Sequence, residues 1–157
     1  MRGYWGIDRS TSHCVAFVDA DEVESELAEL VQQIRQRGLR IAYVDCASYL
    51  DRPLEILSAI GFALGTSHPP YHSRNEPNFV RWLDDVGGLA FSTSGVVIVL
   101  DNAYLLMERH RKFLTDLIEA FLIQFHHWLE RKVPCHLCLQ MSACPLGASL
   151  FAASDEA

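Results

Sequence analysis

Two kinds of hydrophobic pattern alternate along this chain. Short runs of consecutive apolar residues are separated by longer stretches in which apolar residues recur every three or four positions. The first pattern predicts β-strands and the second predicts amphipathic helices. The predicted strands are Cys14–Val18, Arg40–Cys46, Val96–Leu100 and Val133–Met141. The third of these is apolar at every position, which is typical of a parallel strand covered on both faces.

The stretches between these runs have the spacing and the end signals of helices. The predicted helices are Glu22–Arg37, 51–64, Asn78–Asp85 and Phe113–Glu130, with a short helix or turn at Asn102–His110. Gly38 ends the first helix, and Pro53 suits the first turn of the second. Gly87 and Gly88, with the Ser- and Gly-containing stretch before Val96, predict an exposed linker after the third helix.

The resulting order of elements is β-α-β-α-α-β-α-α-β. Strands that alternate with helices predict an α/β domain, in which right-handed crossovers pack helices in two or three layers with a small parallel sheet. We expect this domain to cover residues 14–141. Residues 1–13 are expected to form a flexible N-terminal segment, and residues 142–157 a frayed C-terminal tail.

Composition and charge narrow the classes of partner. The chain has 157 residues, half of them hydrophobic, and 20 acidic against 13 basic residues give a net charge of −7. This balance argues against direct binding of nucleic acid or an anionic membrane, and it is compatible with a basic protein partner. No apolar run is long enough to span a membrane, and the start has no signal-peptide pattern. Five cysteines without a signal peptide predict reduced thiols in the cytoplasm. We expect a monomer when the protein is free.

Two motifs resemble known kinds of site, one for binding phosphate and one for zinc or redox chemistry. The run GVVIVLDN (Gly95–Asn102) looks like the acidic strand end of a phosphate-binding ATPase. The GxxxxGK[ST] loop that would hold the phosphates is missing, so the aspartate is better explained as a turn or cap residue. Cys135 and Cys138 have the spacing of a zinc or redox pair. Within a strand, however, they point to opposite faces, which favours two core cysteines.

The remaining candidates for catalysis are also weak. His126 and His127 are 100° apart on a helix and cannot both face one site. Asp84 and Asp85 diverge in the same way, and no nucleophile motif such as GxSxG is present. We therefore expect no enzyme activity, no cofactor and no metal.

The segment Tyr71–Val86 (YHSRNEPNFVRWLDDV) is the best candidate for a recognition surface. It lies between a strand–helix unit and the apolar strand Val96–Leu100. A loop that carries tyrosine and asparagine leads into a short helix that ends in two carboxylates. Such a combination suits the binding of a protein better than the transformation of a substrate.

Several features occur in linear order over about residues 14–141: RIAYVDC, the helix ILSAIGFALG with the proline–tyrosine turn after it, NEPNFVRWLD, VVIVLDNAYLL, LIEA, and a last strand after Trp128. In this order of features the chain resembles the barstar family of small acidic inhibitors of bacterial ribonucleases. The resemblance implies an inhibitor or immunity protein that blocks the active site of a ribonuclease or other nuclease, in particular a bacterial toxin. In this family the tyrosine loop, the helix after it and an acidic residue of the later long helix bind the nuclease.

By position, Tyr71 matches the loop tyrosine, Asn75 the loop asparagine and Glu119 the acidic residue of the long helix. Two family aspartate positions hold Pro77 and Arg81 here, and an arginine facing a basic active site would repel it. The complete set of candidate partner-binding residues is Tyr71, Asn75, Glu76, Arg81, Asp84, Asp85 and Glu119.

Each candidate has a structural alternative. Tyr71 could pack on the prolines before it, Asn75 could cap the short helix, and Arg81 could pair with Asp85 at i,i+4. For the whole protein, the alternative to inhibition is a non-inhibitory interaction or regulatory module with a barstar-like fold, which the replaced carboxylates favour. A degenerate ATPase-like domain is a third interpretation. The site assignment requires Glu119 to lie close to residues 71–86.

Overall fold

The computed structural model describes residues 15–18, 31–65, 71–73, 76–92, 95–130, 135–142, 145–147 and 151. The predicted N-terminal segment, residues 1–13, lies outside this part of the chain. In chain order the elements are β1 (Val15–Val18), β2 (Arg40–Asp45), the 3-10 helix η2 (Cys46–Tyr49), α2 (Glu55–Leu64), β3 (His72–Ser73), β4 (Glu76–Pro77), α3 (Phe79–Ser92), β5 (Val96–Asp101), α4 (Ala103–Arg109), α5 (Arg111–Glu130) and β6 (Cys135–Gln140). Residues 31–36 are also helical.

The four predicted strands form one parallel sheet in the order β1-β6-β5-β2. The register sets Asp45 at the end of β2 beside Asp101 at the end of β5. The short strands β3 and β4 pair separately as an antiparallel hairpin. The predicted α/β class with a small parallel sheet is therefore confirmed.

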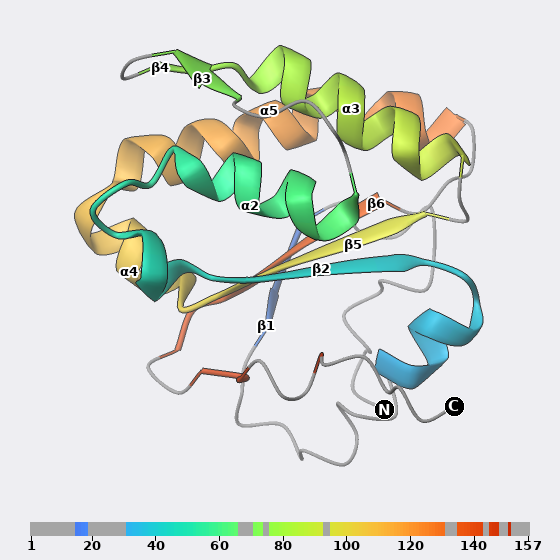
Figure 1. Ribbon diagram of the computed structural model, residues 1–157, viewed down its shortest axis with the longest axis horizontal. Coiled ribbons are helices and arrows are strands. Elements are labelled where there is room, and N and C mark those ends of the chain that lie inside the picture. The colour runs from blue at the N-terminus through green and yellow to red at the C-terminus, as the bar shows by residue number, and fades with distance from the viewer. Residues whose placement is uncertain are drawn as a thin grey trace.

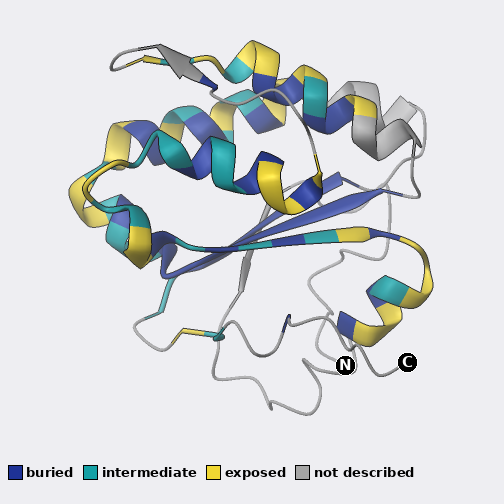
Figure 2. Cartoon of the chain, in the orientation of Figure 1, coloured by how far each residue is buried: buried dark blue, intermediate teal, exposed yellow. Residues whose placement is uncertain are grey.

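Helices cover both faces of the sheet (Figure 1). Helices α2, α3 and α5 lie on one face, where their apolar side chains join Ile98 and Leu100 of β5 in the larger core cluster. Residues 31–36 lie on the other face, where a smaller cluster contains Val97 and Val99. Every residue of β5 is buried (Figure 2). The two-sided burial predicted for the apolar run Val96–Leu100 is confirmed.

Helix α3 is longer than the sequence predicts. It continues through Gly87 and Gly88 to Ser92, and Gly87 is buried, so the predicted end at Asp85 and the exposed glycine linker are wrong. The physical reason is that packing outweighs the cost of roughly 1 kcal/mol for each glycine in a helix. Trp82 and Val86 are fully buried on the same side of the helix, against the core.

The described residues of the predicted C-terminal tail pack on the domain. The backbone N–H groups of Leu146 and Gly147 donate to the carboxylate of Asp101, at 2.9 and 2.8 Å. Phe151 is buried and stacks on Tyr43, with 5.0 Å between the ring centroids. These contacts attach the segment after β6 to the face of the sheet that residues 31–36 also cover. None of the helices in the described part of the chain is long and apolar enough to cross a membrane.

Candidate functional site

Tyr71 is the residue that ties the predicted recognition segment to the core. Its side chain is fully buried, and its hydroxyl donates to Asp85 Oδ2 at 2.7 Å. Its backbone carbonyl accepts a hydrogen bond of 2.7 Å from the N–H of Asn78, directly after the hairpin. Tyr71 therefore fixes the hairpin on α3 and does not present its ring to solvent. The proposed packing on the preceding prolines lies outside the described residues.

The start of α3 is capped by Asn78, whose Oδ1 accepts from the N–H of Arg81 at 3.1 Å. Asn75, the capping and contact candidate from the sequence, lies outside the described residues. Arg81 and Asp84 are exposed, while Asp85 is half-buried. Within the described residues Arg81 and Asp85 form no ion pair, because Asp85 is held by Tyr71 instead.

A groove with a volume of about 590 Å³ lies between the hairpin and α5. We call it the hairpin groove, and its lining residues are Glu76, Pro77, Phe79, Lys112, Asp116, Glu119, Ala120 and Ile123. It brings together Glu76 and Glu119, two candidate residues from distant parts of the sequence. The requirement that Glu119 lies close to residues 71–86 is therefore satisfied.

Each wall of the hairpin groove has a simple structural origin. Strand β4 and the first residue of α3 form one wall. The other wall is a single face of α5, because its lining residues lie three or four positions apart along the helix. Phe79 stacks on Phe113 with 6.0 Å between ring centroids, which holds the start of α3 against α5. Ile123 adds an apolar side chain that is 62% exposed.

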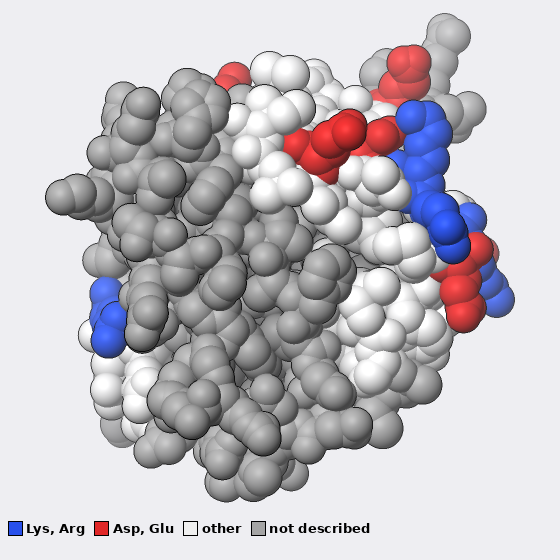
Figure 3. Space-filling view, turned by 180° about the vertical axis from the view of Figure 1, so that it is seen from behind, with Lys and Arg blue, Asp and Glu red and all other residues white. Residues whose placement is uncertain are grey.

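The charge in the hairpin groove is predominantly negative. Lys112 Nζ lies 2.9 Å from Asp116 Oδ2, and this bond and the charge of Asp116 raise the pKa of the lysine. Glu76 and Glu119 are exposed, and their side chains form no hydrogen bond or ion pair with another described residue. Seen from behind, acidic and basic side chains gather at the upper right of the molecule (Figure 3). The carboxylates of Glu76 and Glu119 are thus exposed to an incoming cation, although the charge of Lys112 also acts on Glu119.

A second set of carboxylates, Asp45 and Asp101, lies at the carboxyl ends of β2 and β5, and both accept hydrogen bonds from the protein. Asp101 is fully buried, and it accepts from the hydroxyl of Tyr43 at 2.5 Å in addition to the two N–H groups after β6. Asn102 donates through its Nδ2 to Asp45 Oδ1 at 2.7 Å. Its backbone is left-handed, with φ of 57°, and its N–H points to Asp101 Oδ1 and to Gln140 Oε1.

This network explains the ATPase-like run in the sequence. The carboxyl ends of parallel strands are the usual place for a ligand in open α/β sheets. Here both oxygens of Asp101 accept hydrogen bonds from the protein itself. The interpretation of Asp101 as a turn residue is supported, and burial together with the hydrogen bond to Asp101 raises the pKa of Tyr43.

The two cysteines of the CxxC spacing are separated by the sheet. Cys135 packs with Leu137 and Leu139 in the larger core cluster, whereas Cys138 belongs to the cluster on the other face. The predicted division of the two thiols between opposite faces is confirmed. Burial raises the pKa of Cys138 to about 12. The side chains of His126 and His127 lie outside the described residues.

Comparison of the chain with protein-family models, with curated proteins and with solved structures finds no match. The site therefore has to be interpreted from its own geometry. Sequence reasoning missed the contributions of Phe79, Lys112 and Asp116 to the hairpin groove. The helical spacing that places Lys112 and Asp116 on one face with Glu119 was a usable signal.

Proposed function

We propose that this protein is a barstar-like inhibitor or immunity protein that binds a basic partner through the hairpin groove. The first candidate for the partner is a nuclease, most simply a bacterial toxin that cleaves RNA or DNA. The observation that carries the proposal is that Glu76 and Glu119 line one groove, are exposed, and form no hydrogen bond or close ion pair with a described residue. Both residues are also candidates on the sequence alone.

The chemistry of the groove suits this partner. A nuclease binds phosphates with a cationic active site, and carboxylates from an inhibitor can take the place of those phosphates. Pro77, Phe79 and Ile123 add apolar surface beside the carboxylates, as in the centre of a protein interface. The net charge of −7 would also steer a basic partner toward the protein and raise the association rate.

A specific observation favours a second candidate, a non-inhibitory interaction or regulatory module. Arg81 is exposed at a position where the barstar family has its chief inhibitory aspartate, and no described carboxylate pairs with it. If the interface extends from the hairpin groove onto this face of α3, Arg81 would repel a uniformly basic active site. A partner surface that also carries an acidic group would instead pair with Arg81.

The proposal is tested by capturing the partner from the native host and measuring its nuclease activity with and without this protein. Stoichiometric loss of RNA or DNA cleavage supports the inhibitor. A captured partner without nuclease activity that binds through the same groove supports the interaction module and contradicts inhibition.

Charge-reversal variants then test the groove itself. Glu76→Lys and Glu119→Lys should each weaken binding by about 30-fold or more, since a close interface charge is worth about 2–5 kcal/mol. Glu108→Lys is the matched control, because Glu108 is exposed on α4 and does not line the groove. If Glu108→Lys weakens binding as strongly as the groove variants, only the overall charge matters and the groove assignment is wrong.

A further inference from the structure

Strand β2 is one of the two outer strands of the sheet, and it pairs with β5 alone among the described strands. The N–H of Arg40 donates to the carbonyl of Gly95 on the β5 side. Because backbone groups alternate in direction along a strand, Ile41 and Tyr43 direct their N–H and C=O groups to the outer edge. No described residue bonds to these groups. An unpaired edge of this kind is a template for another strand.

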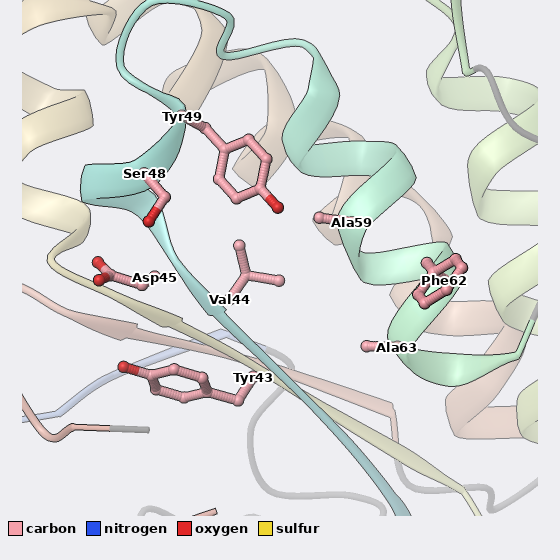
Figure 4. A pocket seen from close by; sticks show the side chains of 8 residues that line it. All are labelled: Tyr43, Val44, Asp45, Ser48, Tyr49, Ala59, Phe62 and Ala63. Carbon is pink, nitrogen blue, oxygen red and sulfur yellow. The ribbon is translucent and has the colours of Figure 1, made fainter. Parts of the chain in front are cut away.

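A cavity of about 370 Å³ lies along the same strand, next to α2 (Figure 4). We call it the edge pocket, and its lining residues are Tyr43, Val44, Asp45, Ser48, Tyr49, Ala59, Phe62 and Ala63. In Figure 4 the side chains of Val44 and Tyr49 lie on the side of β2 that faces α2, whereas the ring of Tyr43 points to the opposite side. The two alanines leave space beside α2, and Phe62 is 83% exposed at its rim.

Asp45, one of the residues that line the edge pocket, has a carboxylate oxygen that can bind a cation. Asp45 Oδ1 accepts from the N–H of Ala47 at 3.0 Å and from Asn102 Nδ2 at 2.7 Å, which fixes the side chain. No described residue donates to its Oδ2. Charge complementarity therefore favours a basic residue of the occupant beside Asp45.

We propose that an extended segment of a partner protein binds along β2 as a fifth strand, with apolar side chains in the edge pocket and a basic residue beside Asp45. In this mode, hydrogen bonds to the backbone provide affinity, and pockets for alternate side chains provide specificity. The unpaired groups of Ile41 and Tyr43 supply the hydrogen bonds. Tyr49, Ala59 and Phe62 select apolar side chains. The edge pocket shares no lining residue with the hairpin groove, so this inference is independent of the proposed function.

Amide hydrogen exchange of the ¹⁵N-labelled full chain tests the proposal, with the peptide acetyl-KVTVTV-amide as the probe. At about 1 mM peptide, binding with a Kd of about 0.1 mM should slow exchange at Ile41 and Tyr43 by about tenfold, since protection scales as one plus the ratio of peptide concentration to Kd. A peptide that carries N-methyl groups on alternate residues cannot donate these hydrogen bonds and should have no effect. Equal effects of both peptides, or no slowing at these amides, would overturn the proposal.

Three variants and one further measurement test whether the peptide occupies the edge pocket. Ala63→Arg should fill the pocket and weaken peptide binding by about tenfold or more, whereas the matched control Gln36→Arg, also exposed on a helix, should change it by less than about twofold. Glu119→Lys, in the hairpin groove, should leave peptide binding unchanged. If Ile41 and Tyr43 are protected without peptide in a concentration-dependent dimer, the edge belongs to a second copy of the chain and the proposal is wrong.

Discussion

The hairpin groove and the network at the strand ends contain the same chemical group in opposite states. At the strand ends, Asp101 is fully buried, and four donors of the protein point at its carboxylate. In the hairpin groove, Glu76 and Glu119 are exposed and form no hydrogen bond or close ion pair with a described residue. The first arrangement stabilises the fold, because a buried carboxylate persists only when its hydrogen bonds are satisfied. The second costs little in the free protein and leaves the charge available.

The difference indicates which region of the molecule is available to bind a partner. In an open α/β sheet the carboxyl ends of the strands are the first place to look for a ligand. Here the segment after β6 covers that place and donates two backbone N–H groups to Asp101. The exposed carboxylates Glu76 and Glu119 lie instead on the helical layer, between the hairpin and α5. Substitutions at both sets of carboxylates test this contrast.

The largest effect is expected for Asp101→Ala. It leaves the hydroxyl of Tyr43 and the N–H groups of Leu146 and Gly147 without their acceptor, and each loss costs about 1–3 kcal/mol. We expect the free energy of unfolding in urea to fall by about 3–6 kcal/mol, a large part of the roughly 5–15 kcal/mol typical of a domain. The control Asp84→Ala, at an exposed carboxylate, should change it by less than about 0.5 kcal/mol. If Asp101→Ala and Asp84→Ala lower the free energy of unfolding by similar amounts, the buried carboxylate does not stabilise the fold more than an exposed one.

The next effect is a loss of stability at alkaline pH. Burial, with the negative charges of Asp45 and Asp101, raises the pKa of Cys46 from 9.0 to about 12. Between these values the unfolded chain has released the proton and the folded chain keeps it, so the folded state is stabilised below pH 9 and loses this stabilisation as the pH rises. Each such thiol should lower the free energy of unfolding by about 1.4 kcal/mol per pH unit. The free energy of unfolding, measured by urea titration at several pH values between 9 and about 11, should fall less steeply with pH for Cys46→Ala than for the unmodified chain. Equal slopes against pH would show that the pKa of Cys46 is not raised in the folded state.

The parts of the fold that the sequence predicts correctly are those in which a local pattern and the packing agree. Strand β5 is apolar throughout because both of its faces are covered, and the same pattern identifies it in the sequence. The failure at Gly87 and Gly88 has the opposite cause. Glycines usually mark the end of a helix, but the burial of Trp82 and Val86 on the core side of α3 outweighs that local preference.

In the candidate site, too, some features could be predicted from the sequence and others could not. Glu76 and Glu119 are candidates on the sequence alone, and the fold brings them into one groove. The burial of Tyr71 could not be predicted, because it depends on how the hairpin is placed against α3. The network at Asp101 was also beyond sequence reasoning, since its donors come from Leu146 and Gly147, far along the chain.

A smaller effect is expected for Tyr71→Phe, which removes the bond to a carboxylate that solvent can still reach. The hydroxyl donates to Asp85 at 2.7 Å, and Asp85 is half-buried, so water can replace the lost donor. The free energy of unfolding should fall by about 1 kcal/mol, measured in urea. Tyr49→Phe is the matched control, because the hydroxyl of Tyr49 has no described partner. If Tyr71→Phe lowers the free energy of unfolding nearly as much as Asp101→Ala does, the carboxylate of Asp85 is held as tightly as that of Asp101.

The smallest effect on stability, and the most informative for function, is expected for Glu119→Gln. Because Glu119 is exposed and forms no described ion pair, neutralising it should change the free energy of unfolding by less than about 0.5 kcal/mol. If the hairpin groove captures a basic partner, the same change should slow association and make the rate less sensitive to salt, since ions screen exposed charges. Stopped-flow association at several salt concentrations measures both quantities. Glu108→Gln removes the same overall charge from an exposed site outside the groove, and it should leave the salt dependence almost unchanged. A clear loss of stability in Glu119→Gln would instead show that this carboxylate stabilises the fold, as Asp101 does. The two regions would then not differ at Glu119, the residue on which the proposed function most depends.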